Sequence, residues 1–331
     1  MTLLIMVMIF ACMALVLFAD IKVLQTSDHF FNSANTGVFR GLWSIVVILV
    51  HIPEPYQNTL QDMIGSFGYI AVTFFFMTSA YGLRKFAIKN GIRGFWKRRL
   101  PKLLVPMAVI NIATACFDLI VLGRISLSSL LLINHWVRWL LFCYFLFWLV
   151  YRLECIKQKD TAIGIAVVAF SLFRYIAFPQ SGWTTEIYGF IWGILLGNET
   201  LFRNKSLGTK EWIANCLMLC GLSAGLGTMY LKCKSILFWG DYLLKILLGL
   251  VILCLILCVN QKVCFGSKAG LWLGNISYEM YLTHALAMRI LLEITKDWMS
   301  GVFIAASVLL TVFLSALEKK VNGYILKRIR L

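Results

Sequence analysis

The sequence predicts an all-α protein: a polytopic membrane helix bundle of about ten or eleven transmembrane helices. Three observations predict it. Of 331 residues, 60% are hydrophobic and only 14% are charged, whereas soluble domains carry about 25% charged residues. Apolar runs close to the roughly 20 residues that cross a bilayer as a helix recur along the chain. The basic residues, which give a net charge of +16, gather in alternate connections between these runs.

We predict a helix for each of eleven apolar runs, at residues 2–19, 37–53, 66–83, 103–122, 129–151, 161–178, 185–198, 211–230, 242–259, 270–291 and 301–317. The first run lacks the basic leader and the small-residue cleavage site of a signal peptide, so we expect it to be retained. The longest connections, 20–36 and 84–102, are too short to hold a soluble domain. We therefore divide the chain into an additional N-terminal helix with its cytoplasmic loop, 1–36, and a membrane domain, 37–331.

Lys and Arg residues are distributed unequally between the two predicted sides of the bundle. One side holds 23 of the 31 and the other side holds 4, with the rest inside or at the ends of spans. Because basic residues favour the cytoplasmic side, we predict an outside N-terminus, a cytoplasmic C-terminus and a location in the plasma or inner membrane. The charge therefore indicates orientation among membrane lipids and does not indicate nucleic acid as a partner.

The ten cysteines carry no sign of a disulfide framework or a metal site. They form no Cys-x-x-Cys pair, and no histidine lies beside them at metal-ligand spacing. Pairs such as Cys216/Cys220 lie inside apolar runs, where cysteine acts as a small hydrophobic residue. We therefore predict no bound metal and no permanently bound cofactor.

Arg40 and His51 are ionisable residues within one apolar run, where charge is costly and therefore marks a candidate functional site. Eleven residues of helix are about three turns, which places both side chains on one face, about 16 Å apart along the axis. Arg40 then lies at the cytoplasmic end of the span and His51 near the outer end. A plainer alternative stays open, in which both residues are interfacial anchors.

Three segments follow the Arg40-x10-His51 pair along the chain. Residues 68–80 (GYIAVTFFFMTSA) form a glycine-aromatic stretch. Residues 97–106 (KRRLPKLLVP) are basic and end in proline, and residues 275–284 (NISYEMYLTH) end in histidine. In this order and spacing, the segments resemble the signature of the acyltransferase-3 family of integral-membrane acyltransferases, over about three quarters of the chain.

The chain departs from the family pattern at three positions. Ala80 replaces the glycine that usually ends the glycine-aromatic stretch. Lys102 stands where a second arginine is common, which weakens bidentate phosphate recognition but keeps the charge. Ala285 departs from the proline often seen next. The helix before Arg40 is also additional to the commoner arrangement.

The resemblance implies transfer of an acyl group, acetyl in the simplest case, from cytosolic acyl-CoA to a hydroxyl of a cell-surface or lipid-linked carbohydrate. Acetyl-CoA is then a co-substrate. Its phosphates need cations at the cytoplasmic face, which Arg98, Arg99 and Lys102 supply, with Arg40 nearby. We hypothesise that His51 is the general base for the acceptor hydroxyl. A covalent acyl-histidine is the less favoured alternative.

Ser277, Tyr281 and His284 have the i, i+4, i+7 spacing of one helix face. We expect this face near the depth of His51, where it positions the acceptor or polarises the thioester carbonyl. His284 joins Arg40 and His51 as a catalytic candidate, mainly through the resemblance. The alternative is a hydrogen-bond network that packs helices together.

Further substrate-binding candidates lie outside this face. Ser79 ends the glycine-aromatic stretch, and Glu186 and Arg138 belong to a group of polar residues near the outer side. We expect Glu186 to pair with an arginine at the acceptor site. Nearby tryptophans fit stacking on sugars or an interfacial aromatic belt equally well.

Two other functional classes are alternatives: a flippase or transporter of a lipid-linked saccharide, and a polysaccharide polymerase. Either would typically offer a long outer loop or broken helices, and the predicted outer connections are short. The basic segment 84–102 favours a cytosolic phosphate ligand, although anchoring to anionic lipid also explains it. The sequence leaves the acceptor, the acyl chain length and a homo-oligomeric state open.

Overall fold

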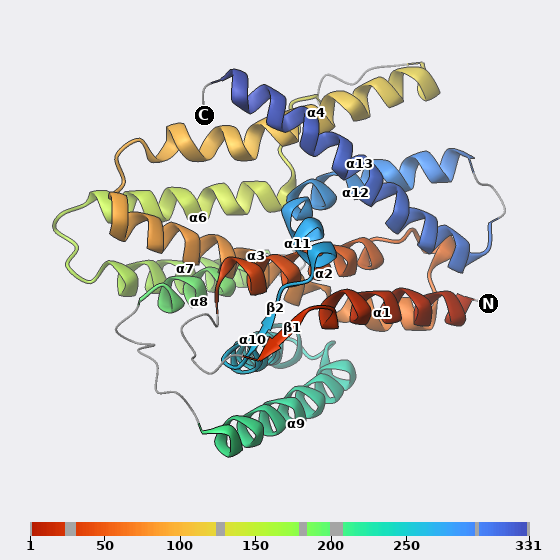
Figure 1. The fold of residues 1–331 in the computed structure, drawn as a ribbon. Helices are drawn as coiled ribbons and strands as arrows, with labels where there is room; N and C mark the ends of the chain where they lie inside the picture. Colours follow the sequence, from red (N-terminus) through yellow and green to blue (C-terminus); the bar gives the residue numbers. More distant parts are fainter. Residues whose placement is uncertain are drawn as a thin grey trace.

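The protein, described by a computed structural model over residues 2–23, 31–123, 130–178, 184–198, 208–294 and 298–329, is a helix bundle (Figure 1). Within these residues it forms twelve α-helices: α1 (Thr2–Phe18), α2 (Ser33–Val50), α3 (Thr59–Asn90), α4 (Phe95–Leu122), α6 (His135–Arg152), α7 (Lys159–Ala177), α8 (Tyr188–Leu196), α9 (Thr209–Cys233), α10 (Lys245–Asn260), α11 (Lys268–Asn275), α12 (Ser277–Ile294) and α13 (Ser300–Arg328). The predicted all-α membrane bundle is confirmed.

Short elements connect several of these helices. A 3-10 turn, η1 (Glu54–Tyr56), joins α2 to α3, and a π-helix, η2 (Trp239–Leu244), runs into α10. Strand β1 (Ile21–Val23) pairs antiparallel with β2 (Val263–Phe265). Polar residues begin many of the helices: Asn58, for example, accepts a hydrogen bond from the backbone N–H of Gln61 at 3.0 Å, as expected of an N-cap.

Ten of the eleven predicted spans each overlap one α-helix, whereas the span predicted at 270–291 is divided between α11 and α12. Among the described residues, seven helical segments are long and apolar enough to cross a membrane: 33–50, 59–90, 95–121, 159–177, 209–233, 239–260 and 300–328. Helix α1 is apolar but has 17 residues, and α8 has only nine. Helices α6 and α12 have 18 residues each and carry several charged side chains. Length and composition therefore support seven spans where the sequence predicted ten or eleven.

The predicted loop 84–102 is wrong, because this segment is mostly helical. Helix α3 continues to Asn90 and α4 already begins at Phe95, so only a tight turn separates them. Gly91, with φ +62°, ends α3 in a backbone conformation that glycine adopts without strain. Lys and Arg are good helix formers, and their long side chains extend towards water from helix ends. The basic residues therefore lie on helical turns.

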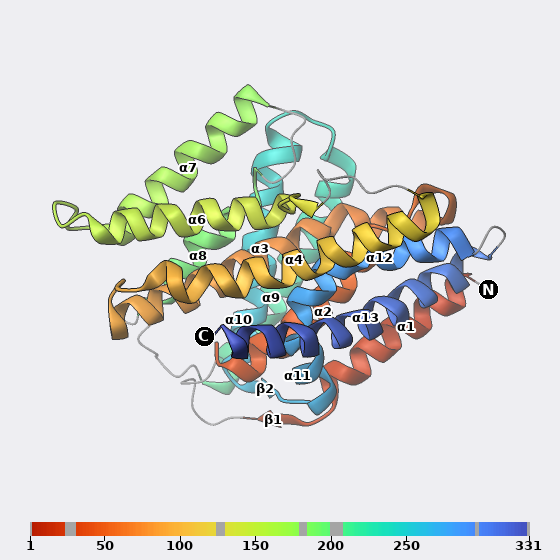
Figure 2. The ribbon, with the colours of Figure 1, turned by 90° about the horizontal axis from the view of Figure 1, so that it is seen from above.

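Helix α3 lies in the interior of the bundle and α9 lies at its edge. More than half of the most apolar stretch of α3 is buried, whereas none of that of α9 is. Figure 1 shows α9 at the bottom of the bundle, next to α10, with α4 and α13 at the opposite side. Figure 2 shows α7 at a further edge, beyond α6.

Helix α8 packs closely on α3 through small residues. Gly189, Gly193 and Gly197 recur every four residues and so share one face of α8. A Cβ at Gly189 would overlap the backbone of Thr73, and a Cβ at Gly193 would overlap that of Met77. Small residues at this spacing let membrane helices approach one another. The contact also places Glu186, just before α8, beside the part of α3 that carries Gly68 and Tyr69.

The N-terminal segment contacts the membrane domain along its length, and two contacts show how it is held. Strand β1 pairs with β2 so that Lys22 lies opposite Cys264. Ser267 Oγ donates to the carbonyl oxygen of Val16 at 2.5 Å. The division into 1–36 and 37–331 stays a prediction, and the two parts share these contacts.

Candidate active site

Helices α2 and α12 are aligned in the same direction and in register. Ser44 Oγ donates to the carbonyl oxygen of Ser277 at 3.2 Å. Seven residues further along each segment, the ring centroids of His51 and His284 lie 4.7 Å apart. The backbones approach closely just before α12, where a Cβ at Gly274 would overlap the backbone of α2. The structure therefore brings the predicted Arg40–His51 face together with the predicted face of α12.

His51 caps the C-terminus of α2 instead of lying inside the helix. The sequence predicted a span to residue 53, but α2 ends at Val50. Pro53 explains the difference, because the residue before a proline disfavours helical conformation. His51 Nδ1 lies 2.8 Å from the carbonyl oxygen of Val47. A carbonyl oxygen only accepts hydrogen bonds, so Nδ1 carries the proton and Nε2 of the neutral ring presents its lone pair.

His284 has the same arrangement in a buried setting. Its side chain is 6% exposed, and its Nδ1 lies 2.7 Å from the carbonyl oxygen of Tyr281. Nε2 of the neutral ring is again the free acceptor. The Tyr281 ring lies 5.8 Å from the His284 ring and 4.8 Å from that of Trp136. Two imidazole rings, each held through Nδ1, thus lie beside an aromatic wall.

The first cavity, which we name the Arg40 cavity, has a volume of about 120 Å³ and lies among α2, α3, α4, α6 and α12. Four predicted site residues line it: Arg40, Ser79, Ser277 and Tyr281. The remaining lining is largely aromatic and apolar: Phe75, Thr78, Leu103, Trp136, Leu140, Tyr144 and Tyr278. Arg40 Nε is buried without a hydrogen-bond partner. Since an unpaired buried donor is costly, the cavity suits a ligand with an anionic or strongly polar group.

The second cavity, which we name the His51 cavity, has a volume of about 420 Å³. It contains His51 and Glu186 and is lined further by Val47, Val50, Asp62, Gly65, Ser66, Gly68, Tyr69, Val72, Tyr230, Lys234 and Lys245. Glu186 was expected to pair with an arginine. Its partner is instead Lys245, whose Nζ lies 2.9 Å from Glu186 Oε1.

The two cavities lie at successive levels along the same pair of helices. The Arg40 cavity meets α3 at 75–79, and the His51 cavity meets α3 at 62–72. Helix α3 returns antiparallel to α2 after a short connection, and Gly68 lies against Val50. His51 therefore lies at the far end of α2 from Arg40, with the Arg40 cavity between the basic start of α4 and the two histidines.

Arg98, Arg99 and Lys102 lie on the first two turns of α4. The guanidinium carbons of Arg98 and Arg99 lie 4.7 and 5.4 Å from the centroid of the Phe86 ring. Lys102 is exposed. Arg99 precedes Leu103, a residue of the Arg40 cavity, by four positions and so shares its helix face. The basic cluster is thus one helical turn away from that cavity.

Arg138 is not brought together with the other candidates. It is exposed on the first turn of α6 and lines neither the Arg40 cavity nor the His51 cavity. The prediction that it binds substrate has no support from this position.

Several residues of the two cavities were missed by the sequence reasoning. Tyr69 lies inside the glycine-aromatic stretch, and Tyr144 and Tyr230 lie in other apolar runs. Tyrosine at regular helical spacing looks like packing in a sequence, so these residues carried no separate signal. Only the arrangement of the helices shows that they line cavities.

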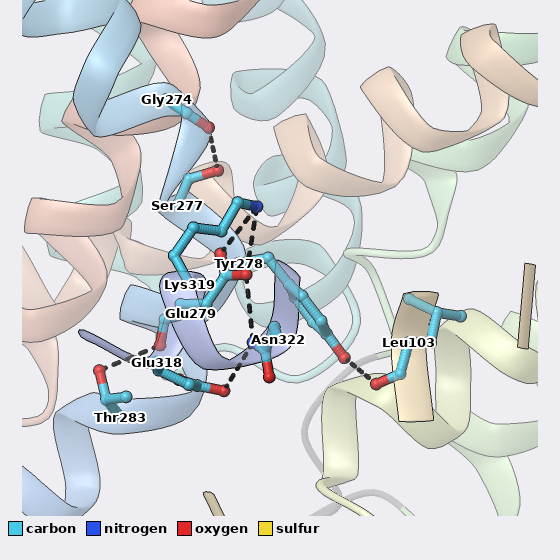
Figure 3. A network of polar contacts seen from close by, with 9 residues as sticks. All are labelled: Leu103, Gly274, Ser277, Tyr278, Glu279, Thr283, Glu318, Lys319 and Asn322. Carbon is cyan, nitrogen blue, oxygen red and sulfur yellow. Dashed lines mark hydrogen bonds and ion pairs between the residues drawn. The ribbon is translucent and has the colours of Figure 1, made fainter. Parts of the chain in front are cut away.

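A polar network holds α12 from the side that faces α13 (Figure 3). Glu279, which is 2% exposed, pairs with Lys319 at 3.1 Å and accepts from Asn322 Nδ2 at 3.4 Å. The hydroxyl oxygens of Thr283 and Ser315 lie 2.6 Å apart. These contacts fix the rotation and axial position of α12, and with them the direction in which Tyr281 and His284 point.

Within the described residues, no group of three or more His, Cys, Asp or Glu side chains is placed to hold a metal ion. All ten cysteines are free thiols, and Cys216 and Cys258 lie with their sulfur atoms 3.4 Å apart. The polar groups that line the two cavities or lie beside them include imidazole, hydroxyl and guanidinium groups.

Comparison with known proteins places this geometry in a family. A family model described as an acyltransferase domain, Acyl_transf_3, matches residues 34–317, a range that contains Arg40, His51 and His284. No curated protein and no solved structure matches the chain.

Proposed function

The chain belongs to the acyltransferase-3 family of membrane acyltransferases, and from this premise we propose that it is an O-acyltransferase, specifically an acetyltransferase. The donor in this proposal is cytosolic acetyl-CoA, and the acceptor is a hydroxyl of a cell-surface or lipid-linked carbohydrate. The family match favours this function over a flippase or a polymerase. The orientation is the one that the basic residues predict, with the start of α4 at the cytoplasmic face and His51 towards the outer face.

The donor would enter at the basic start of α4. Arg98, Arg99 and Lys102 offer cations to the CoA phosphates there, and phosphate is a good acceptor for such groups. The flexible arm would follow the Arg40 cavity, whose apolar and aromatic walls suit its methylene groups. The unpaired Nε of Arg40 would donate to one of the polar groups of the arm. This route brings the thioester to the histidine pair.

The transfer step needs one base and no external oxidant or reductant. Nε2 of His51 takes the proton of the acceptor hydroxyl as its oxygen attacks the thioester carbonyl carbon. The carbon–sulfur bond then breaks, and the departing CoA thiolate receives the proton from the imidazolium. The ring of His284, whose centroid lies 4.7 Å from that of His51, would accept a hydrogen bond from the acceptor molecule through Nε2 and so position it for attack.

One observation carries the proposal: two imidazole rings, each with Nδ1 within hydrogen-bond distance of a backbone carbonyl oxygen, lie with their centroids 4.7 Å apart, and His51 lines the His51 cavity. With Nδ1 donating, Nε2 of a neutral ring is left as the acceptor. A base held in this way beside a polar cavity is what the transfer step requires.

The decisive experiment uses the purified full-length protein with acetyl-CoA labelled in the acetyl group. We expect the wild type to release free CoA thiol and to pass label to a carbohydrate acceptor. His51→Ala should lower this rate by about a hundred- to ten-thousandfold, the usual contribution of a general base. Thermal unfolding of the variant shows whether the fold is kept. A folded His51→Ala variant with full activity contradicts the base assignment.

The orientation is tested separately. Asn90→Cys, at the exposed end of α3, should react with a membrane-impermeant thiol reagent only when the cytoplasmic face is accessible. The native cysteines are first replaced by serine or alanine to remove background. Labelling of intact cells at position 90 would invert the proposed topology and place the donor cluster on the wrong side for cytosolic CoA.

A further inference from the structure

One wall of the His51 cavity is built by segments outside the family-like motifs, opposite the wall that α2 and α3 supply. Tyr230 and Lys234 come from the end of α9, Lys245 from the start of α10, and Glu186 from the turn before α8. The cavity volume of about 420 Å³ lies in the range of small-ligand sites. This wall therefore gives the chain a binding surface of its own beside the proposed base.

The buried charges of this wall neutralise each other. Lys245 Nζ lies 2.9 Å from Glu186 Oε1, and the side chains are 20% and 7% exposed. The second carboxylate oxygen of Glu186 accepts from Thr185 Oγ1 at 3.2 Å. The remaining charged residues of the lining, Asp62 and Lys234, are exposed and of opposite sign. An anionic ligand would thus meet the carboxylate of Glu186. Lys245, the cation that could bind such a ligand, is already paired with Glu186.

Tyr69 offers the cavity an aromatic face and an unused hydroxyl. Its side chain is 8% exposed, and its hydroxyl oxygen is buried with no hydrogen-bond partner. Lys245 Nζ lies 4.8 Å from the centroid of its ring, and the Tyr230 ring packs edge-on at 5.8 Å. Buried hydroxyl groups in native proteins are rarely left unpaired. A ligand hydroxyl is the partner that this position lacks.

The position of Lys245 is fixed by an unusual turn. Phe238, with φ +65°, donates its backbone N–H to Tyr175 Oη at 2.6 Å and to Asp241 Oδ1 at 2.7 Å. The π-helix η2 follows, and its Tyr242 hydroxyl lies 2.9 Å from that of Tyr188 on α8. Single π-helical turns often occur at functional sites. The turn joins the Lys245 wall to the helix that carries Glu186 at its start, so the pair is held in place before any ligand binds.

We propose that the His51 cavity is an acceptor subsite that selects an uncharged, hydroxyl-bearing ring over an anionic one, with Tyr69 and the Glu186–Lys245 pair as its specificity-determining residues. This inference rests on the proposed function and adds the charge class of its acceptor. A neutral ring can lay its C–H face, which carries partial positive charge, on the π face of Tyr69. Its hydroxyl groups can pair with the Tyr69 hydroxyl without disturbing the ion pair. A carboxylate or phosphate in the same place faces Glu186, whose neighbour Lys245 is already paired, while the other lysine of the lining, Lys234, is exposed and donates to Ser66 Oγ at 2.9 Å.

The test measures binding without any acyl donor. The purified full-length protein in lipid nanodiscs is titrated with matched pairs of probes: methyl glucoside against methyl glucuronide, and the corresponding galactose and mannose pairs. Saturation-transfer NMR or calorimetry gives the dissociation constants. At least one neutral glycoside should bind about tenfold more tightly than its uronide, the size expected of one charged hydrogen bond gained or lost.

Two variants assign the preference to the named residues. Glu186→Gln frees the charge of Lys245 and should raise affinity for the uronide about tenfold. Tyr69→Phe keeps the ring and removes the hydroxyl, and should weaken the neutral glycoside several-fold without changing the uronide. Tyr324→Phe, at an exposed position of α13, is the matched control and should change neither.

Three outcomes overturn the inference: no neutral glycoside binds, uronides bind as tightly as their neutral partners, or Glu186→Gln leaves the preference unchanged. If Glu186→Gln does not fold, Tyr69→Phe alone decides. A failure of the proposed function looks different. In that case glycosides bind as expected but acetyl-CoA is not consumed. Consumption of acetyl-CoA with no glycoside binding instead leaves the function intact and removes this subsite.

Discussion

The Arg40 cavity and the His51 cavity differ in whether their charged groups are paired. The Arg40 cavity holds one cation whose Nε has no partner, within apolar and aromatic walls. The His51 cavity holds two carboxylates and two lysines beside His51, and its buried carboxylate, Glu186, is paired with Lys245. An unpaired cation favours whichever ligand brings an anionic or polar group, while a closed ion pair disfavours ligands that would break it. The contrast indicates two different ligands on the two sides of the histidine pair.

The two cavities also differ in the segments that line them. The predicted residues of the Arg40 cavity come from the motif segments that resemble the acyltransferase-3 family. The His51 cavity shares α2 and α3 with these motif segments, and its remaining wall comes from the end of α9, the start of α10 and the turn before α8. A common donor with a varying acceptor would produce this division. Substitutions in and around the two cavities test this difference, and their expected effects range from the largest, at the histidine pair, to the smallest, at Arg138.

Substitutions of the histidine pair, His51 and His284, are expected to have the largest effect on kcat. His51→Ala should lower kcat about a thousandfold and His284→Ala about a hundredfold, because only one ring acts as base while the other supports it. The double variant should be no more than tenfold slower than His51→Ala, since residues that act as a unit are not additive. Steady-state kinetics with acetyl-CoA measure all three. Equal and independent losses would mean that the two rings belong to separate steps.

Arg40 tests the donor side of the comparison. Arg40→Met removes the unpaired cation and keeps the volume, and should raise the KM for acetyl-CoA about ten- to a hundredfold, the range of one or two charged hydrogen bonds. The KM for the acceptor should stay within twofold. Arg40→Lys restores the charge without the planar fork and should recover part of the loss. An equal effect on both substrates would contradict the assignment of the Arg40 cavity to the donor.

The polar network between α12 and α13 tests whether contacts on the α13 side of α12 stabilise the helix that carries His284. Glu279→Gln leaves Lys319 without its carboxylate partner and should lower the free energy of unfolding by about 1–3 kcal/mol, less than for a fully buried pair because Lys319 is partly exposed. Thermal unfolding in detergent measures it. Lys320→Gln, at the exposed neighbouring position, is the control and should change stability little. A large change in the control would show that surface charge, and not the network, sets the stability.

The basic cluster on α4 should give a moderate effect that depends on salt. Arg99→Gln should raise the KM for acetyl-CoA about three- to tenfold at low salt, and less at high salt, since exposed charges are screened. Lys89→Gln removes an exposed cation at the end of α3 and serves as the comparison. An equal effect of both substitutions would indicate general attraction of anions to this face.

Arg138 should give the smallest effect. It is exposed and lines neither cavity, so Arg138→Gln should change the KM of either substrate by less than about twofold, as for most surface substitutions. Acceptor kinetics check this. A change above fivefold would return Arg138 to the acceptor site as the sequence first suggested.

The sequence predicted the helices well and their ends less well. Apolar runs identified the position of every predicted span, because length and hydropathy are local properties of the chain. The end of α2 at Val50 and the helical character of 84–102 were missed, since they depend on Pro53 and on how basic side chains extend from helix ends. Motif spacing predicted Arg40, His51 and His284 as members of one site, and the structure brings His51 beside His284.

What the sequence determined by itself is the class of protein, the predicted orientation and one line of candidate residues along α2 and α12. These follow from hydropathy, the distribution of basic residues and helical periodicity, which need no knowledge of neighbouring helices. The tertiary structure alone decided that His51 meets His284, that Glu186 pairs with Lys245, and that two cavities of unlike charge flank the pair. The physical reason is that such contacts join residues from 59 to 233 positions apart, and only helix packing brings them together.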